Sequence, residues 1–200
     1  MFDRVVSEIN CDKVVVDDVL GSKNAVAKLI QNGCKSIAIL TTNDYVSVGK
    51  LRTQGYLEAL EEHGILPNGN LILKVDDNRL SEEHFDALEK EIKQLFINNK
   101  QIDGVFAVNE LYAITAIKVA RSLGLNIPEN IQVIGFTDGV LSKHSTPSLT
   151  TVSQHEQVIG EKAAELLIQR LEDDEADDET EEHYQTLVIA TELVERNSTK

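Results

Sequence analysis

The sequence predicts an α/β fold in which a parallel sheet carries helices on both faces, a doubly wound arrangement. Short apolar runs alternate with longer helical patterns along most of the 200 residues. The runs are mostly apolar throughout, without polar alternation, which is typical of strands buried on both faces. Hydrophobic residues make up 42% of the chain, which is ample for a core of this size.

Five apolar runs are predicted as strands. They are short and rich in valine and isoleucine, which favour extended backbone. A sixth extended segment, "SLTTV" (148–152), follows Pro147, and that proline disfavours helical geometry at Thr146. The five predicted strands are 13–16, 36–40, 71–75, 104–108 and 131–136.

Helical patterns fill the stretches between the strands. A glycine closes three of them, at Gly33, Gly64 and Gly124, and predicts a left-handed cap at each end. Ser81 is a good N-cap for another, because two glutamates follow it in the first turn. The predicted helices are 24–33, 51–64, 81–96, 110–124 and 156–171.

Charge and cysteine content narrow the class of protein. The formal net charge is −15, so this chain by itself is not expected to bind the phosphate backbone of nucleic acid. Much of the acid lies in "EDDEADDETEE" (172–182), which predicts a solvated loop. Cys11 and Cys34 lack a CxxC spacing and are expected to be reduced core thiols. Without a membrane-length apolar run or a signal-peptide core, the chain is expected to be cytoplasmic and free of the membrane.

Polar loops follow four predicted strands and should line one edge of the sheet, where such folds bind ligands. No nucleotide fingerprint, nucleophile elbow or HExxH helix occurs in the sequence. Asp76 and Asp77 could hold magnesium, but a lone acidic pair in a loop is more typical of a turn. A binding protein is therefore expected, with no catalysis, no cofactor and no metal. The four loops are 41–50, 76–79, 109–110 and 137–139.

The same loops and strands resemble a known family along nearly the whole chain. The similar segments include "FDR" (2–4), "IPENIQVIGF" (127–136), "TPSLTTV" (146–152) and "LVERNST" (193–199). The chain resembles the effector-binding core of the lactose/galactose-repressor family of bacterial transcription regulators. The resemblance implies a periplasmic-binding-protein type I fold, with two similar subdomains and a chain that crosses between them three times.

The resemblance also implies a division of the chain. Met1 falls where the family's first subdomain would end, so one complete subdomain and part of the other are expected, without the helix-turn-helix. "SLTTV" is expected to be a crossover strand. The expected parts are 1–17 (remnant of the N-terminal subdomain), 18–152 (C-terminal subdomain), 153–172 (helix returning to the N-terminal subdomain), 173–183 (acidic loop) and 184–200 (final strand and tail of the C-terminal subdomain).

Two residues of the large predicted lobe match family positions that bind effector. Arg52, in "RTQGY", corresponds to a cleft arginine whose fork of donors orients an oxygen-rich ligand. The alternative is a surface helix arginine. Asn109 lies at the tip of a predicted strand, where its amide can bond a sugar hydroxyl. It can equally cap the following helix, and both roles can hold.

Three further residues complete the expected site. Thr137, in "GFTDG", stands where many sugar-binding members have an aspartate, and threonine cannot make that bidentate contact. Asp138 is expected to point away from the ligand. Gln154 matches a cleft position, with a solvent-facing helix start as the alternative. Asp3 matches a position near the cleft on the other lobe.

The resemblance implies partners as well as a site. A small molecule, a sugar or a derivative, is the expected effector; a homodimer is expected, and operator DNA would be bound only through the absent N-terminal region. The loop 76–79 lacks the aromatic that many members stack on the effector, and Tyr45 is the substitute candidate. The helix 110–123 is apolar nearly all round, which fits either a dimer face or burial in the chain.

Two functions of other classes stay open at this stage. A transport-type solute-binding protein shares the fold, but it would need an export signal. An enzyme would need a catalytic cluster in the polar loops, and the sequence shows none.

Overall fold

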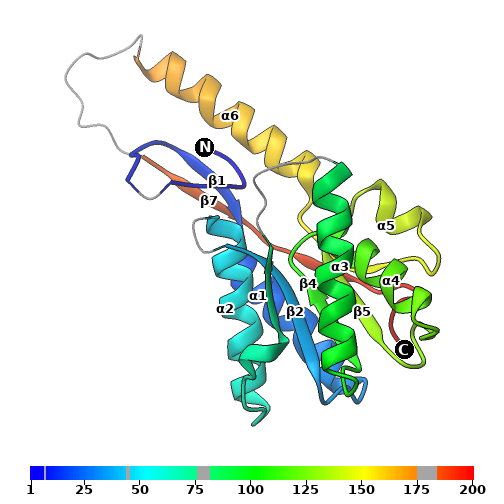
Figure 1. The fold of residues 1–200 in the computed structure, drawn as a ribbon. Helices are drawn as coiled ribbons and strands as arrows, with labels where there is room; N and C mark the ends of the chain where they lie inside the picture. The colour runs from blue at the N-terminus through cyan, green and yellow to red at the C-terminus, as the bar shows by residue number, and fades with distance from the viewer. Residues whose placement is uncertain (7, 44–45, 76–81, 175–183) are drawn as a thin grey trace.

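The computed structural model describes residues 1–6, 8–43, 46–75, 82–174 and 184–200, and its strands form two sheets (Figure 1). The strands are β1 (Lys13–Val16), β2 (Ile37–Thr42), β3 (Ile72–Val75), β4 (Gly104–Ala107), β5 (Gln132–Phe136), β6 (Thr150–Ser153), β7 (Thr186–Ile189) and β8 (Glu192–Val194). The larger sheet has the order β3–β2–β4–β5–β6–β8, and the smaller pairs β1 with β7. Only the pairing of β8 with β6 is antiparallel among the described strands.

Helices cover both faces of the larger sheet. They are α1 (Asp18–Gln31), α2 (Ser47–Glu62), α3 (Glu82–Asn98), α4 (Glu110–Ser122), α5 (Val140–His144) and α6 (Glu156–Asp174), with a 3-10 turn at Gly69–Leu71. α1 and α2 pack together on one face, and α3 and α4 pack together on the other (Figure 1). The predicted doubly wound parallel α/β fold is confirmed, with β8 as an antiparallel edge strand.

Two helices begin earlier than the sequence pattern predicts. α1 begins at Asp18, because the side chain of Asp17 accepts a hydrogen bond of 3.0 Å from the backbone N–H of Leu20 and caps the helix. α2 begins at Ser47, so the polar loop predicted at 41–50 is shorter than expected. The sequence pattern did not predict α5, a short helix of five residues.

The chain passes between the two sheets three times. It leaves the small sheet after β1 and enters α1, which packs on the large sheet. It returns after β6 to α6, which packs on β1 and β7, and crosses again between β7 and β8 (Figure 1). The assignment of these two sheets to the subdomains of one binding protein stays a prediction.

The segment 184–200 contributes one strand to each sheet, whereas the sequence predicts a single final strand in the larger lobe. β7 pairs with β1 in the small sheet, and the backbone N–H of Lys13 donates to Gln185 at 2.8 Å beside that pairing. β8 then pairs with β6 in the large sheet. A one-strand prediction fails here because the two pairings depend on partners far away in sequence.

α4 is buried in the chain, which favours the burial alternative over a dimer face. Its small and apolar side chains lie between the large sheet, α3 and α5. Its exposed Lys118 forms an ion pair with Glu89 of α3. The acidic loop predicted at 173–183 falls largely outside the described residues. Within the described ranges, no helix has the length and apolar character needed to cross a membrane.

Candidate functional site

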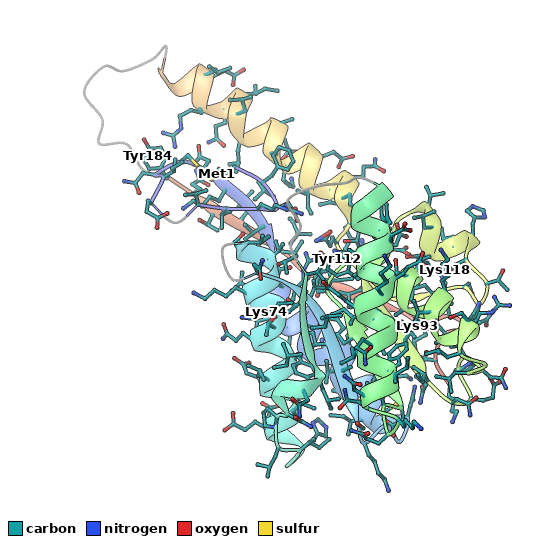
Figure 2. The ribbon with its side chains drawn as sticks, viewed as in Figure 1. Met1, Lys74, Lys93, Tyr112, Lys118 and Tyr184 are labelled. Carbon is teal, nitrogen blue, oxygen red and sulfur yellow. The ribbon has the colours of Figure 1, made fainter. Side chains whose placement is uncertain are left out.

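The carboxyl ends of β2 and β4 lie side by side at the point where the strand order reverses. β2 leads through α2 to β3 on one side, whereas β4 leads through α4 to β5 on the other. Open α/β sheets bind ligands at such a topological switch point. The small sheet lies beyond this edge, and Figure 2 labels Tyr112, in the first turn of α4, at the end of the large sheet nearest to it.

Arg52 is buried beneath this edge. Its Nε donates to Oδ1 of Asp18 at 2.7 Å, and its Nη1 donates to the carbonyl oxygen of Val108 at 2.6 Å. The guanidinium carbon lies 3.7 Å from the centroid of the Phe136 ring, which forms a cation–π contact. Arg52 is only 3% exposed, so the alternative of a surface helix arginine is excluded.

The Arg52–Asp18 ion pair is almost fully removed from water. Burial raises the pKa of Asp18, and the attraction of Arg52 opposes that shift. Burial likewise lowers the pKa of Arg52, and Asp18 opposes it. Each charge in such a pair needs the other, because an unpaired charge in the interior costs several kcal/mol. The pair therefore holds Arg52 in one orientation under the ends of β4 and β5.

Asn109 lies two residues after the end of β4 and is the N-cap of α4. Its Oδ1 accepts a 2.8 Å hydrogen bond from the backbone N–H of Tyr112. The capping role that the sequence suggested is therefore present. The Nδ2 group has no recorded partner among the described residues, so it is available to a ligand acceptor at the half-buried edge.

Thr137, Gln154 and Asp3 form a chain of hydrogen bonds from the large sheet to the N-terminal segment. Oγ1 of Thr137, just after β5, donates to Oε1 of Gln154 at 3.0 Å. Nε2 of Gln154, just after β6, donates to Oδ1 of Asp3 at 3.4 Å. Asp3 is in turn fixed to the small sheet, because its backbone N–H donates to the carbonyl oxygen of Val14 at 3.0 Å.

Thr137 has a positive φ of 81°, which is unusual for a β-branched residue and strains the backbone. The surrounding bonds hold it there: its N–H donates to Val152 at 2.9 Å, and Oγ1 of Thr151 donates to its carbonyl oxygen at 2.7 Å. The next residue, Asp138, accepts from Arg196 at 2.6 Å instead of joining the hydrogen-bond chain described above.

The structure thus places all five residues expected at the site along this edge: Arg52 and Asn109 lie beside Val108, and Thr137, Gln154 and Asp3 form the hydrogen-bond chain. Two participants escaped the sequence reasoning. Asp18 follows β1 as Asn109 follows β4, so the same strand-end rule could have found it. Phe136 offered no such signal, because its contact with Arg52 depends on how α2 lies over the sheet.

Tyr45, Asp76 and Asp77 lie outside the described residues, and so the stacking and magnesium alternatives placed on them stay untested. Among the residues that the structure does describe, no group of three or more histidine, cysteine or acidic side chains is arranged to hold a metal ion. The described residues of the site are hydrogen-bonding groups around one buried ion pair, and no paired nucleophile and base occurs among them.

Comparison with known proteins defines the class. Residues 26–199 match the periplasmic binding protein-like domain, so the chain belongs to that family. The ribose operon repressor of Haemophilus influenzae is 31% identical over 200 residues, which are 99% of this chain and 56% of that protein. The transcriptional regulator CelR of Thermobifida fusca is 30% identical, over 96% of this chain and 53% of CelR. The chain spans about half the length of these curated relatives.

Solved structures agree with this family. The CelR–cellobiose complex superposes with a TM-score of 0.84 at 28% identity, covering 96% of this chain and 55% of that one. A regulatory protein of the LacI family from Chloroflexus aggregans gives a TM-score of 0.81 at 28% identity, over 100% and 67% of the two chains. The resemblance to the lactose/galactose-repressor family is therefore confirmed. These relatives are regulators of transcription and not enzymes.

Proposed function

We propose that this chain is the effector-sensing part of a LacI-type transcription regulator. A small molecule binds at the carboxyl edge of the large sheet and thereby controls operator binding by a separate DNA-binding region. The observation that carries this proposal is the convergence of Arg52, Asn109, Thr137, Gln154 and Asp3 at the junction of the two sheets. A repressor of a ribose operon and a regulator complexed with cellobiose are among its relatives, which supports a sugar or a related metabolite as the effector.

The site is built to couple ligand binding to a change of arrangement. Arg52, Asn109 and Thr137 belong to the large sheet or its helices, whereas Asp3 is bonded to the small sheet. A ligand that contacts both groups favours the arrangement in which they are correctly spaced. In a homodimer, which we include in the proposal, this shift would alter the spacing of two DNA-binding regions and link the two binding events. The regulator would act in the cytoplasm.

The relatives support this function over the two alternatives. A transport-type solute-binding protein shares the fold, but the relatives described above are regulators of transcription. An enzyme would need reactive groups at the switch point, and its described residues offer only hydrogen-bonding groups and the Arg52–Asp18 pair.

The test is the thermal shift of the purified chain with a panel of sugars, nucleosides and their derivatives. A ligand at about 100 times its Kd stabilises by about 2.7 kcal/mol, which raises the Tm of a chain of this size by roughly 5–10 °C. Gln154→Leu removes the central link of the hydrogen-bond chain, so we expect about tenfold weaker binding and a shift that is roughly halved.

Gln94→Leu is the matched control, because Gln94 lies on the exposed side of α3 and bonds only Asn98 among the described residues. It should retain the whole shift. Arg52→Ala is a poorer test, since it strands the buried charge of Asp18 and is expected to destabilise the chain by about 3–5 kcal/mol. A ligand whose shift is equal in both glutamine variants would place binding elsewhere and contradict the proposal.

A further inference from the structure

The positive charge of Arg52 is already balanced by a carboxylate inside the protein. Nε of Arg52 is bonded to Asp18 and Nη1 to the carbonyl oxygen of Val108, while the ring of Phe136 covers one face of the guanidinium. The Arg52–Asp18 pair as a whole therefore presents no net charge to a ligand. The guanidinium can still donate a hydrogen bond through Nη2, for which the described residues record no partner.

Among the described residues, the charges that act on the Arg52–Asp18 pair have a negative sum. After burial and the ion pair itself, the charges of Asp3 and Asp17 act on the pKa of Asp18. Those of Asp3 and Arg4 act on the pKa of Arg52. These groups amount to three carboxylates against two guanidiniums. In a partly buried site, such an excess acts at short range with little screening by solvent.

Asp3 is the carboxylate most directly presented to a ligand. It adopts a left-handed backbone conformation with φ 60°, and its carboxylate accepts from Gln154, the middle member of the chain that ends at Thr137. Its position is fixed further by Val5, whose N–H donates to Oγ of Ser47 at the start of α2 at 3.1 Å. The carboxylate therefore lies between the two sheets and has capacity left to accept a hydrogen bond from a ligand.

The hydrogen-bonding groups are complementary to an uncharged molecule with both donors and acceptors. Nδ2 of Asn109 and Nη2 of Arg52 can donate, whereas Asp3 and Oγ1 of Thr137 can accept. Hydroxyl groups satisfy both kinds of partner. A phosphate or carboxylate, by contrast, only accepts and would meet the negative charge of Asp3.

We propose that this site selects uncharged polyhydroxyl ligands and rejects their phosphorylated or carboxylated counterparts, and that Asp3 is the residue that enforces the rejection. This inference rests on the proposed function, since it concerns the same site. It extends that function by fixing the charge class of the effector and by assigning the discrimination to one side chain.

The experiment compares each neutral ligand with an anionic partner of the same skeleton. Glucose is paired with glucose 6-phosphate, cellobiose with cellobiose 6′-phosphate, and the nucleosides of the panel with their 5′-phosphates, because each of these phosphates keeps the ring form of its neutral partner. Binding of each is measured by calorimetry on the 200-residue chain. We expect any neutral ligand that binds to do so at least about tenfold more tightly than its anionic partner, because like charges at close range repel.

Asp3→Asn keeps the size and the acceptor oxygen of the side chain but removes its charge. It should reduce the ratio of the anionic ligand's Kd to the neutral ligand's Kd by about tenfold, mainly because the anion binds more tightly. Asp86→Asn is the matched control, because Asp86 is an exposed carboxylate of α3 and no hydrogen bond or ion pair is recorded between it and the five residues of the site. It should leave the ratio unchanged.

The outcomes separate the two proposals. An anionic ligand that binds as tightly as its neutral partner, and loses affinity in Gln154→Leu, would overturn the charge selection and leave the sensing function intact. If the ratio of the anionic to the neutral ligand's Kd is the same in Asp3→Asn and Asp86→Asn, Asp3 does not cause the discrimination. Binding of no compound in the panel would count against the sensing function, and the charge selection would fall with it.

Discussion

The buried hydroxyl of Tyr56 links α2 to the large sheet. Its ring is fully buried on α2, and its hydroxyl donates to the carbonyl oxygen of Ile37 at 2.9 Å, where β2 begins. Burial raises the pKa of the phenol to about 12. The pKa of the Cys34 thiol, in the turn just before β2, is also raised to about 12. Burial is the main cause, and the negative charge of Asp103 adds to it. Both groups are therefore neutral in the folded chain across the physiological range.

These shifts predict alkaline instability. In the unfolded chain Tyr56 ionises near pH 10, so its contribution is complete below that pH and is lost as the pH rises towards 12. Tyr56→Phe should cost about 1 kcal/mol at pH 7 and reduce the slope of stability between about pH 10 and 12. Urea unfolding at several pH values measures both effects.

Single residues were only partly predictable from sequence. Arg52 and Asn109 could be placed at the site because both match effector-binding positions of the family that the sequence resembles, and Asn109 also follows a predicted strand. The pairing of Arg52 with Asp18 could not, since it joins two helices whose relative position depends on packing. The left-handed conformation of Thr137 was also beyond sequence reasoning, because a β-branched residue ordinarily avoids it.

At the scale of elements, α1 and α2 approach each other unusually closely at Gly55. A Cβ atom there would lie 2.2 Å from the carbonyl oxygen of Val19 and 2.8 Å from Cβ of Ser22. The close packing of the two helices thus depends on a residue without a side chain. By contrast, a Cβ atom at Gly160 in α6 would meet nothing within 4 Å.

The two glycines form a matched pair for mutation. Gly55→Ala should destabilise by roughly 1–3 kcal/mol through overpacking, even though alanine gains up to about 1 kcal/mol of helix propensity. Gly160→Ala has only the gain and should stabilise by up to about 1 kcal/mol. Urea denaturation of both variants provides the measurement. If both variants changed the free energy of unfolding by the same amount and in the same direction, helix propensity and not the α1–α2 contact would account for the effect of Gly55→Ala.

Most elements of the large sheet were predictable, because their apolar runs are short and their helices are amphipathic. The start of α1 was not, since it depends on the cap made by Asp17. α5 escaped because a helix of one turn has no periodicity to detect. The separate pairings of β7 and β8 could not be foreseen, as each is decided by a distant strand.

At the scale of the whole molecule, the two sheets are covered very differently. The large sheet is enclosed by helices, while the small sheet carries α6 and leaves apolar side chains in solvent. A cavity of about 660 Å³ lies between α6 and β1. Exposed apolar patches of this kind favour association. The exposed side chains on α6 are Leu167 at 60%, Ile168 at 56% and Leu171 at 58%.

Concentration-dependent self-association is the expected consequence. Sedimentation velocity over a range of concentrations should show it, and the double substitution Leu167→Lys with Leu171→Lys should weaken it by at least about tenfold, since each leucine contributes on the order of 1 kcal/mol or more to a buried contact. Leu66→Lys is the control, because Leu66 is 89% exposed and isolated after α2. Association that is unchanged in the double variant would place the contact elsewhere.

The three crossings between the sheets also determine how the molecule can be divided. The strands run in sequence from the small sheet (β1) to the large sheet (β2 to β6), back to the small sheet (β7) and again to the large one (β8). Breakage at any one peptide bond therefore leaves no fragment that holds one sheet whole and nothing of the other. Two pieces expressed separately would each carry strands of a shared sheet and would have to reassemble to fold, so split-protein complementation is a natural assay for this chain, whereas isolating either sheet by a single cut is not feasible.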